Sequence, residues 1–416
     1  MRVAVVGAGV FGRNHLRVYR ELERAGYPVE LAAVVDPDAG ARERAAAEYG
    51  VRGFASIEEC MAAGRAEPTK ANTGIPAPAS KLPPQRTSSL GTPVLAGDPV
   101  RAAQGQNDKS KGSAENDKWI DAASVCVPTL HHAECARTLM AAGVDLLIEK
   151  PLAASLADAD EMVRLAGEHG RIVQVGHLER FNPAVRAVRK LLNRPMFFEV
   201  HRLSVFTPRA LDVDVVLDLM IHDLDIVLSL TGQPVREVRA VGLPVLSKKV
   251  DIANVRLEFE NGCVANFTAS RVSTERVRKM RFFQPHQYLS LDFARQDLLL
   301  IDVSAAAGMD PARMAQIVHP TLCTPASNDR SPGTPLSDET GKDGAPGAGG
   351  HPSPGMAIRK VSVEAGEPLR LEIESFLGAV RTRTQPVVTV EDGRAALKLA
   401  LEINAAIGSH ARRTGL

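Results

Sequence analysis

The glycine-rich turn near the start of this 416-residue chain is the feature that most constrains its fold. The run before the turn, residues 2–6, is short, β-branched and without polar alternation, which predicts a parallel strand covered on both faces. The segment after it, residues 14–25, has apolar residues at helical spacing. Between strand and helix, a Gly-x-Gly-x-x-Gly pattern allows a tight turn, close approach of backbone to a pyrophosphate, and close packing of helix on strand.

An acidic residue follows the second predicted strand, residues 31–35, about 20 residues beyond the glycines. A carboxylate at that position, here Asp36, can accept hydrogen bonds from both ribose hydroxyls and would repel a 2′-phosphate. This favours NAD over NADP, although Arg42 and Arg44 on the next helix could soften the preference. The helix N-terminus adds N–H groups and a positive dipole end for the pyrophosphate. The cofactor residues predicted from this unit are Gly7, Gly9, Val10, Phe11, Gly12 and Asp36.

The charge balance and the cysteines narrow the possible partners. Lys plus Arg number 50 and Asp plus Glu number 49, so no basic field points to nucleic acid or to an anionic membrane surface. The five cysteines form no C-x-x-C pair, and they suggest neither a disulfide framework nor a metal site. The sequence shows no leader and no run of about 18 apolar residues. We therefore expect a cytoplasmic protein with a small-molecule partner and no metal.

Two stretches, residues 67–118 and 320–355, are rich in Pro, Ser, Thr and Gly and lack periodicity, which predicts disordered insertions outside the core. Around the first one, strands alternate with helices, which predicts an α/β fold with a doubly wound parallel sheet. Between residues 196 and 292, successive short strands predict a second, predominantly antiparallel sheet. The outward face of this sheet must be covered or charged, and packing against the sheet of another subunit would cover it. We therefore expect a homodimer or homotetramer formed through this sheet.

Three later segments, together with the glycine turn, resemble a known family. They are residues 128–132 (Pro-Thr-Leu-His-His), 149–151 (Glu-Lys-Pro) and 218–225 (Asp-Leu-Met-Ile-His-Asp-Leu-Asp). In this order and spacing they resemble the Gfo/Idh/MocA oxidoreductases, although Thr129 and Met220 stand where that family commonly has Asn and Gly. The resemblance implies a Rossmann domain, then an α+β domain with a large open sheet, and NAD(P)-dependent oxidation or reduction of a secondary alcohol on a sugar, inositol or related polyol.

The resemblance also predicts how the chain is divided. C-terminal helices of this family return to pack on the first domain. The predicted units are residues 1–150 for NAD binding, 151–367 for substrate binding and oligomerisation, and 368–416 for the returning helices.

A carboxylate and an imidazole, Asp218 and His222, lie four residues apart on a predicted helix, residues 213–230. This spacing places them on one face, and a carboxylate that orients an imidazole is a general-base arrangement. Without the resemblance, a solvated acidic helix face is the simpler interpretation. The resemblance places both residues beside Lys150, which follows a buried strand. The hypothesis is that His222 accepts a proton, Asp218 orients it, and Lys150 polarises the reacting oxygen or itself carries the proton.

For several further predicted site residues, a structural or solvent-exposed role is an alternative to a role in the site. For Lys150 alone, the alternative is a structural ion pair, and for Arg180 and Asn182 it is surface solvation. A basic cluster could meet substrate phosphates or a partner's acids, with a solvated surface as the default; its members are Arg271, Arg276, Arg278, Lys279 and Arg281. The resemblance adds cofactor residues Pro128, His132, Glu149 and Lys150, and substrate residues Arg180, Asn182 and Asp225.

The substrate is the least constrained expectation. Residues 176–183 and 218–225 look most similar to nucleotide-sugar members of the family that oxidise UDP-N-acetylglucosamine to a 3-keto sugar. The main alternative is a dehydrogenase of myo-inositol or of a free sugar. Outside enzymes, an NAD-binding sensor or a scaffold on the same fold remains open at this point.

Overall fold

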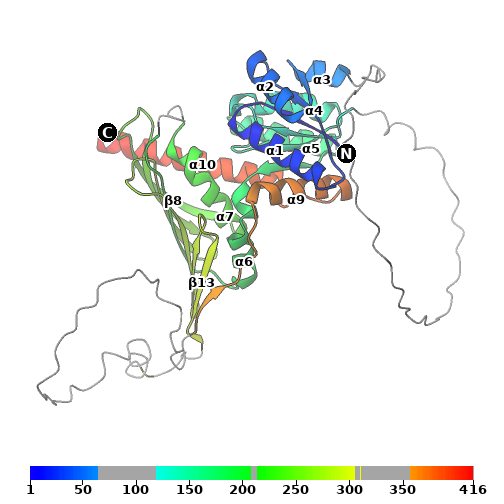
Figure 1. Cartoon of the computed structure of the whole chain (residues 1–416). Helices are drawn as coiled ribbons and strands as arrows, with labels where there is room; N and C mark the ends of the chain where they lie inside the picture. Colours follow the sequence, from blue (N-terminus) through cyan, green and yellow to red (C-terminus); the bar gives the residue numbers. More distant parts are fainter. Residues whose placement is uncertain (64–118, 208–212, 305–309, 311–356, 416) are drawn as a thin grey trace, which may run out of the picture.

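Two sheets organise the chain, one in each domain (Figure 1). The computed structural model describes residues 1–63, 119–207, 213–304, 310 and 357–415. Both predicted insertions, residues 67–118 and 320–355, lie entirely outside the described residues.

The first sheet has six strands in the order β3-β2-β1-β4-β5-β6, and every pairing between neighbours is parallel. This is the strand order of a dinucleotide-binding fold, and it confirms the predicted doubly wound Rossmann sheet. The order reverses between β1 and β4, where ligands bind in such sheets. The strands are β1 (Arg2–Val6), β2 (Glu30–Val35), β3 (Arg52–Phe54), β4 (Ala122–Val125), β5 (Asp145–Glu149) and β6 (Val173–Gly176).

The sheet continues past residue 150, where the first domain was expected to end. After β5 the chain forms α5 (Leu156–Glu168) and returns as β6, which pairs in parallel with β5. A parallel pairing needs such a crossover helix, so β6 belongs to the first sheet although its sequence follows the predicted boundary. Helices α1 (Val10–Arg24), α2 (Ala39–Tyr49), α3 (Ile57–Ala63) and α4 (His132–Ala141) complete this part.

The second sheet has eight strands in the order β14-β13-β12-β11-β7-β10-β9-β8. All neighbours pair antiparallel except β7 and β10, which confirms the predicted, mainly antiparallel sheet. Three of its strands, β11, β13 and β14, were missed, and β11 was hidden by its cationic residues. The strands are β7 (Phe197–Leu203), β8 (Val235–Leu243), β9 (Ile252–Phe259), β10 (Val264–Ser270), β11 (Val277–Gln284), β12 (Gln287–Asp292), β13 (Asp297–Asp302) and β14 (Ala357–Val361).

Helices cover one face of this sheet. Apolar residues of α6 (Pro183–Leu191), α7 (Ile221–Thr231) and α10 (Val390–Thr414) join alternate strand residues such as Phe198 and Phe282 in one buried core. The residues between them, on the opposite face, are partly buried or exposed, as the strand period of two requires.

The two C-terminal helices hold the domains together (Figure 1). Helix α9 (Pro368–Thr382) packs Phe376 and neighbouring apolar residues into the core beside α1 of the Rossmann domain. Helix α10 begins with a capping box made by Thr389 and Asp392. Its early residue Leu397 lies in the Rossmann core, whereas Ile403 lies in the core of the second domain. Only part of the segment 368–416 therefore packs on the first domain.

Candidate active site

The glycine turn between β1 and α1 is tight at two positions and open at one. Gly7 has a φ of +98°, and a Cβ there would lie 2.7 Å from the carbonyl oxygen of Cys126. A Cβ on Gly12 would lie 1.7 Å from the carbonyl oxygen of Gly7. Around Gly9, in contrast, no heavy atom lies within 4 Å of such a Cβ, and no side chain caps the helix that starts there. The first-turn N–H groups therefore face open space suited to a phosphate.

The carboxylate of Asp36 lies at the end of β2 and is held by two backbone donors. The Ala8 N–H donates to its Oδ2 at 2.7 Å, and the Asp38 N–H donates to its Oδ1 at 2.8 Å. The side chain of Arg42, which was considered as a ligand for a 2′-phosphate, donates to the backbone carbonyl oxygen of Asp36 at 2.8 Å. The carboxylate is thus fixed, with accepting capacity left for ribose hydroxyls.

A cavity of about 760 Å³ connects these features at the switch point of the sheet. Its dimensions and its open glycine turn fit a dinucleotide. The predicted residues that line the cavity are Gly7, Gly9, Val10, Phe11, Asp36 and Pro128. Gly12, His132, Glu149 and Lys150 do not line it, whereas His131, the neighbour of His132, does.

His132 is buried, and its ring joins two chain segments. Its Nδ1 lies 3.0 Å from the carbonyl oxygen of Pro151, and its Nε2 lies 3.0 Å from that of Val127. Burial lowers the pKa of His132, against the opposing effect of these carbonyl oxygens. The ring therefore supports the loops that follow β4 and β5, and direct contact with the cofactor stays a prediction.

Glu149 belongs to a buried chain of polar side chains that no sequence pattern predicted. Its Oε1 lies 2.9 Å from Nε2 of His15, whose Nδ1 lies 3.1 Å from Oγ of Ser124. The Tyr19 hydroxyl lies 2.9 Å from the same Oγ. These residues come from α1, β4 and β5, up to 134 positions apart, so no local spacing could reveal them. The chain anchors the carboxyl end of β5, where Lys150 follows.

Lys150 connects the two domains. Its Nζ donates to the backbone carbonyl oxygen of Asp218 at 2.8 Å, and it lies 3.9 Å from Oδ1 of the same residue. Burial lowers the pKa of Lys150, while Asp218 and Glu149 act in the opposite direction. The amine is therefore close to a carboxylate yet poorly solvated, as in sites where a lysine polarises an oxygen or transfers a proton.

The helix that carries Asp218 and His222 begins as a π-helix, Val216–Met220, before α7. Such turns are rare and often occur at functional sites. His222 is partly buried, and its inaccessible Nδ1 has no hydrogen-bond partner among the described residues. Burial, together with Lys150 and Arg202, lowers the pKa of His222 well below its ordinary value. Within the described part of the chain, Asp218 contacts Lys150 and makes no hydrogen bond to His222.

A second imidazole, His177, lies beside His222 and was not expected at the site. The two ring centroids are 6.4 Å apart with an edge-on arrangement. His177 is 1% exposed, and neither of its ring nitrogens has a hydrogen-bond partner among the residues described. Its Nδ1 lies 4.0 Å from Oδ2 of Asp225. The only sequence signal was its position directly after β6, at the edge of the sheet where ligands bind.

The three predicted substrate residues are buried, and their side chains make hydrogen bonds within the protein; they are Arg180, Asn182 and Asp225. Arg180 donates to both carboxylate oxygens of Asp225, at 2.6 and 2.9 Å. Asn182 caps α6 through the Ala184 N–H at 3.1 Å and donates to the carbonyl oxygen of Phe293 at 3.1 Å. Their polar atoms are thus used within the fold, because these residues lie at the junction of β6 with the second domain. As substrate ligands they stay predictions.

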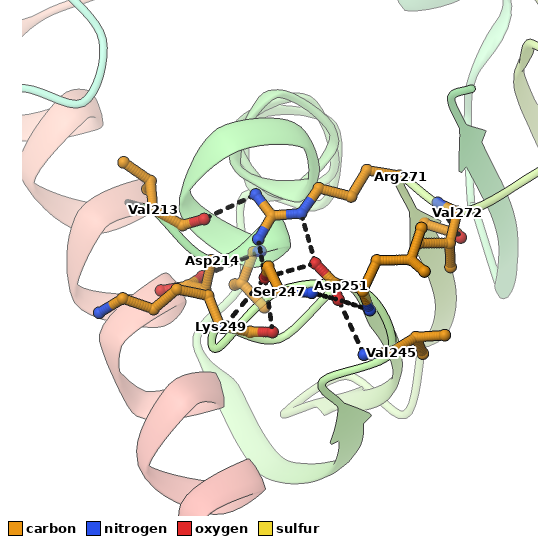
Figure 2. Close-up of polar contacts among 11 residues, drawn as sticks. Val213, Asp214, Val245, Ser247, Lys249, Asp251, Arg271 and Val272 are labelled. Atoms are coloured by element: carbon orange, nitrogen blue, oxygen red, sulfur yellow. Dashed lines mark hydrogen bonds and ion pairs between the residues drawn. The ribbon is translucent and has the colours of Figure 1, made fainter. Parts of the chain in front are cut away.

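A buried ion pair anchors the start of the helix that carries Asp218 and His222 (Figure 2). Arg271, at the end of β10, donates to Asp251 Oδ1 at 2.7 Å and to the carbonyl oxygen of Val213 at 2.7 Å. Three backbone N–H groups, those of Val245, Leu246 and Ser247, donate to the other oxygen of Asp251. Burial favours the neutral acid, but these hydrogen bonds and Arg271 hold the pKa of Asp251 below its usual range. Arg271 is therefore an internal anchor.

Two further observations concern other classes of site. In the part of the chain that the structure describes, no group of His, Cys, Asp and Glu residues is placed to hold a metal ion. None of the described helices is long and apolar enough to cross a membrane.

Both halves of the chain match profiles of one enzyme family. Residues 1–70 and 105–177 match the oxidoreductase family with an NAD-binding Rossmann fold, Gfo/Idh/MocA. Residues 159–284 match the Gfo/Idh/MocA C-terminal domain. The chain therefore belongs to the Gfo/Idh/MocA family of oxidoreductases, which confirms the resemblance seen in its motifs and its class as an enzyme.

Individual relatives add detail. UDP-N-acetylglucosamine 3-dehydrogenase of Acidithiobacillus ferrooxidans is 29% identical over 414 residues, which cover 99% of each chain. A solved structure of that enzyme superimposes with a TM-score of 0.69 at 27% identity, covering 98% of both chains. Myo-inositol 2-dehydrogenase of Thermotoga maritima is 28% identical over 170 residues, 37% of this chain and 51% of its own. An Agrobacterium radiobacter oxidoreductase solved with NAD⁺ shares the fold, with a TM-score of 0.66 at 14% identity over 98% of this chain and 96% of its own.

Proposed function

We propose that this protein is an NAD-dependent dehydrogenase that oxidises a secondary hydroxyl of a nucleotide sugar, of the UDP-N-acetylglucosamine type, to a 3-keto sugar. The observation that carries the dehydrogenase chemistry is the contact between Lys150, at the end of β5, and Asp218, in the π-helix before His222. It brings an amine and a carboxylate together across the two domains, and His222 follows four residues later on the same helix. The nucleotide-sugar substrate is supported by the relative that matches this chain along 99% of both sequences.

The proposed roles follow from the environments of these side chains. His222 is partly buried and has a lowered pKa, so it is neutral at pH 7 and able to accept the hydroxyl proton. Lys150 polarises the reacting oxygen and stabilises developing negative charge. Asp218 holds the lysine in place, instead of orienting His222 as first expected. A bound NAD would supply the hydride acceptor, held by the open turn at Gly9 and by Asp36.

Specificity for NAD is proposed from the fixed carboxylate of Asp36. A 2′-phosphate would meet this negative charge, and Arg42 is already used by the backbone. We expect Asp36→Ala to weaken NAD binding and to narrow the difference between NAD and NADP. Measuring kcat/KM for both cofactors tests this, and an unchanged ratio would count against the assignment.

The substrate proposal is tested by following NAD reduction with a panel of UDP-sugars and free polyols. UDP-N-acetylglucosamine should give the highest kcat/KM, and the product should carry a 3-keto group by mass spectrometry after borodeuteride reduction. Myo-inositol or a free sugar is the second candidate, because inositol dehydrogenases are also among the relatives. Turnover of polyols without turnover of any UDP-sugar would select that candidate.

Two further expectations belong to the proposed enzyme. A homodimer or homotetramer through the second sheet is supported by aromatic residues on its uncovered face, where Phe197, Phe283 and Tyr288 pack together. Light scattering of the purified protein tests this, and a monomer would refute it. A cytoplasmic location also stays a prediction, and fractionation of expressing cells would test it.

A further inference from the structure

The strand β11 carries three cations of the basic cluster, Arg278, Lys279 and Arg281, and divides them between two faces of the sheet. Met280 and Phe282 are buried in the core under the helices. Because side chains alternate along a strand, Arg278 lies on this helix-covered face, whereas Lys279 and Arg281 lie on the opposite one. Arg281 is paired there with Glu199 at 2.9 Å. Only Arg278 among these strand cations therefore lies on the face that carries the candidate active site.

The register places Arg278 opposite Arg202, a residue that is bound to helix α7, which carries His222. The Cα partner of Arg278 on β7 is Arg202, and opposite residues of an antiparallel pair present their side chains on the same face. Arg202 binds both oxygens of Asp223 at 2.7 Å, and Asp223 follows His222 in the chain. Consistent with this position, the positive charge of Arg278 contributes to lowering the pKa values of Lys150 and His222.

The two opposed arginines differ in how their charges are compensated. Arg202 is buried and neutralised by Asp223 and by Glu179, which lies 3.2 Å away. Arg278 is exposed, and its guanidinium makes no hydrogen bond or ion pair with any residue that the structure describes. An uncompensated guanidinium whose charge acts on Lys150 and His222 disfavours a further cation there and favours an anion. Guanidinium groups bind phosphate oxygens through paired N–H donors.

We propose that Arg278 binds the diphosphate of the substrate and so selects nucleotide sugars over free polyols. This inference rests on the proposed function, because it names the contact by which the same site would recognise UDP-N-acetylglucosamine. A free polyol has no anionic group that Arg278 could bind, so the residue would contribute nothing to its affinity. The diphosphate of NAD is a different group, since it belongs at the glycine turn of the first domain.

The test compares Arg278→Gln with Lys279→Gln, a neighbouring exposed cation on the other face of β11. Loss of charge-assisted hydrogen bonds should raise the KM for UDP-N-acetylglucosamine by about 10- to 100-fold in Arg278→Gln, with the loss on KM rather than kcat. Titration with UDP and with uridine gives a second measurement without turnover. The variant should lose affinity for UDP and keep that of the wild type for uridine, while Lys279→Gln should bind both as the wild type does.

The outcomes separate this inference from the proposed function. Wild-type protein that oxidises UDP-N-acetylglucosamine, with Arg278→Gln unchanged in KM and UDP affinity, would overturn only the role of Arg278. A rise in the KM for NAD instead would also overturn it. Wild-type protein that oxidises polyols and does not bind UDP would overturn the substrate assignment itself. Arg278→Lys keeps the charge without the paired donors, so partial recovery of UDP affinity is expected.

Discussion

The open position in the glycine turn gives the sharpest test of the cofactor site. Gly9→Ala adds one methyl group at a residue whose φ of −67° and ψ of −169° suit alanine. No heavy atom lies within 4 Å of the new Cβ, so the substitution causes no clash within the protein. Alanine is a poorer N-cap than glycine but loses less entropy on folding, so the free energy of unfolding should change by less than about 1 kcal/mol.

The same methyl group should be costly for the cofactor. It would occupy the space through which a pyrophosphate reaches the first-turn N–H groups of α1. Losing one hydrogen bond to a charged group costs about 1.5–3 kcal/mol, which corresponds to about a 10- to 150-fold rise in the Kd for NAD. Isothermal titration calorimetry measures this Kd, and thermal unfolding without NAD measures the stability.

Two other glycines serve as controls. Gly12→Ala would place a Cβ 1.7 Å from the carbonyl oxygen of Gly7, so the protein should be destabilised even without NAD. Gly167→Ala, in helix α5 with free space around the new Cβ, should keep wild-type NAD affinity and slightly raise stability. Wild-type NAD affinity in Gly9→Ala would refute the assignment of this turn as a phosphate site.

Three further predictions concern the catalytic groups and the fold. Single-turnover hydride transfer should fall by about 10²- to 10⁴-fold in both His222→Ala and Lys150→Ala, and unimpaired transfer in both would reject their roles. The pKa values of His222 and Lys150 are both lowered, which fixes the expected pH profile of kcat/KM. On the acid side, kcat/KM should fall only below pH 6.5, where His222 gains a proton. On the alkaline side, it should begin to fall below pH 10.5, where Lys150 loses a proton. An acid limb that persists in His222→Ala would assign it to another group. Asp225→Asn should cost about 3–5 kcal/mol in urea unfolding, because it leaves the buried Arg180 charge with only the more distant carboxylate of Asp392, 3.8 Å away. A loss below about 1 kcal/mol would contradict this.

The local units of this protein could be predicted from the sequence because each is contiguous. The strand, glycine turn and helix at residues 2–25 have their own period and their own steric requirements, and Asp36 follows at a spacing set by one more strand. Alternation and turn residues likewise predicted most strands of the second sheet. Strand β11 was missed, because its alternation of buried and exposed residues is masked by cationic residues on both faces.

The functional assignment of polar residues depended on tertiary contacts. Lys150 and Asp218 are 68 residues apart, and only folding shows that Asp218 holds the lysine through its backbone carbonyl and its carboxylate. Among the described residues, that carboxylate makes no hydrogen bond to His222. Arg180 and Asp225 had the pattern of site residues but satisfy each other in the core. A sequence shows which residues can carry charge or a proton. Burial and neighbours decide whether such a group is used by the fold, as in Arg271, or left without a hydrogen bond among the described residues, as are the side chains of His177 and Arg278.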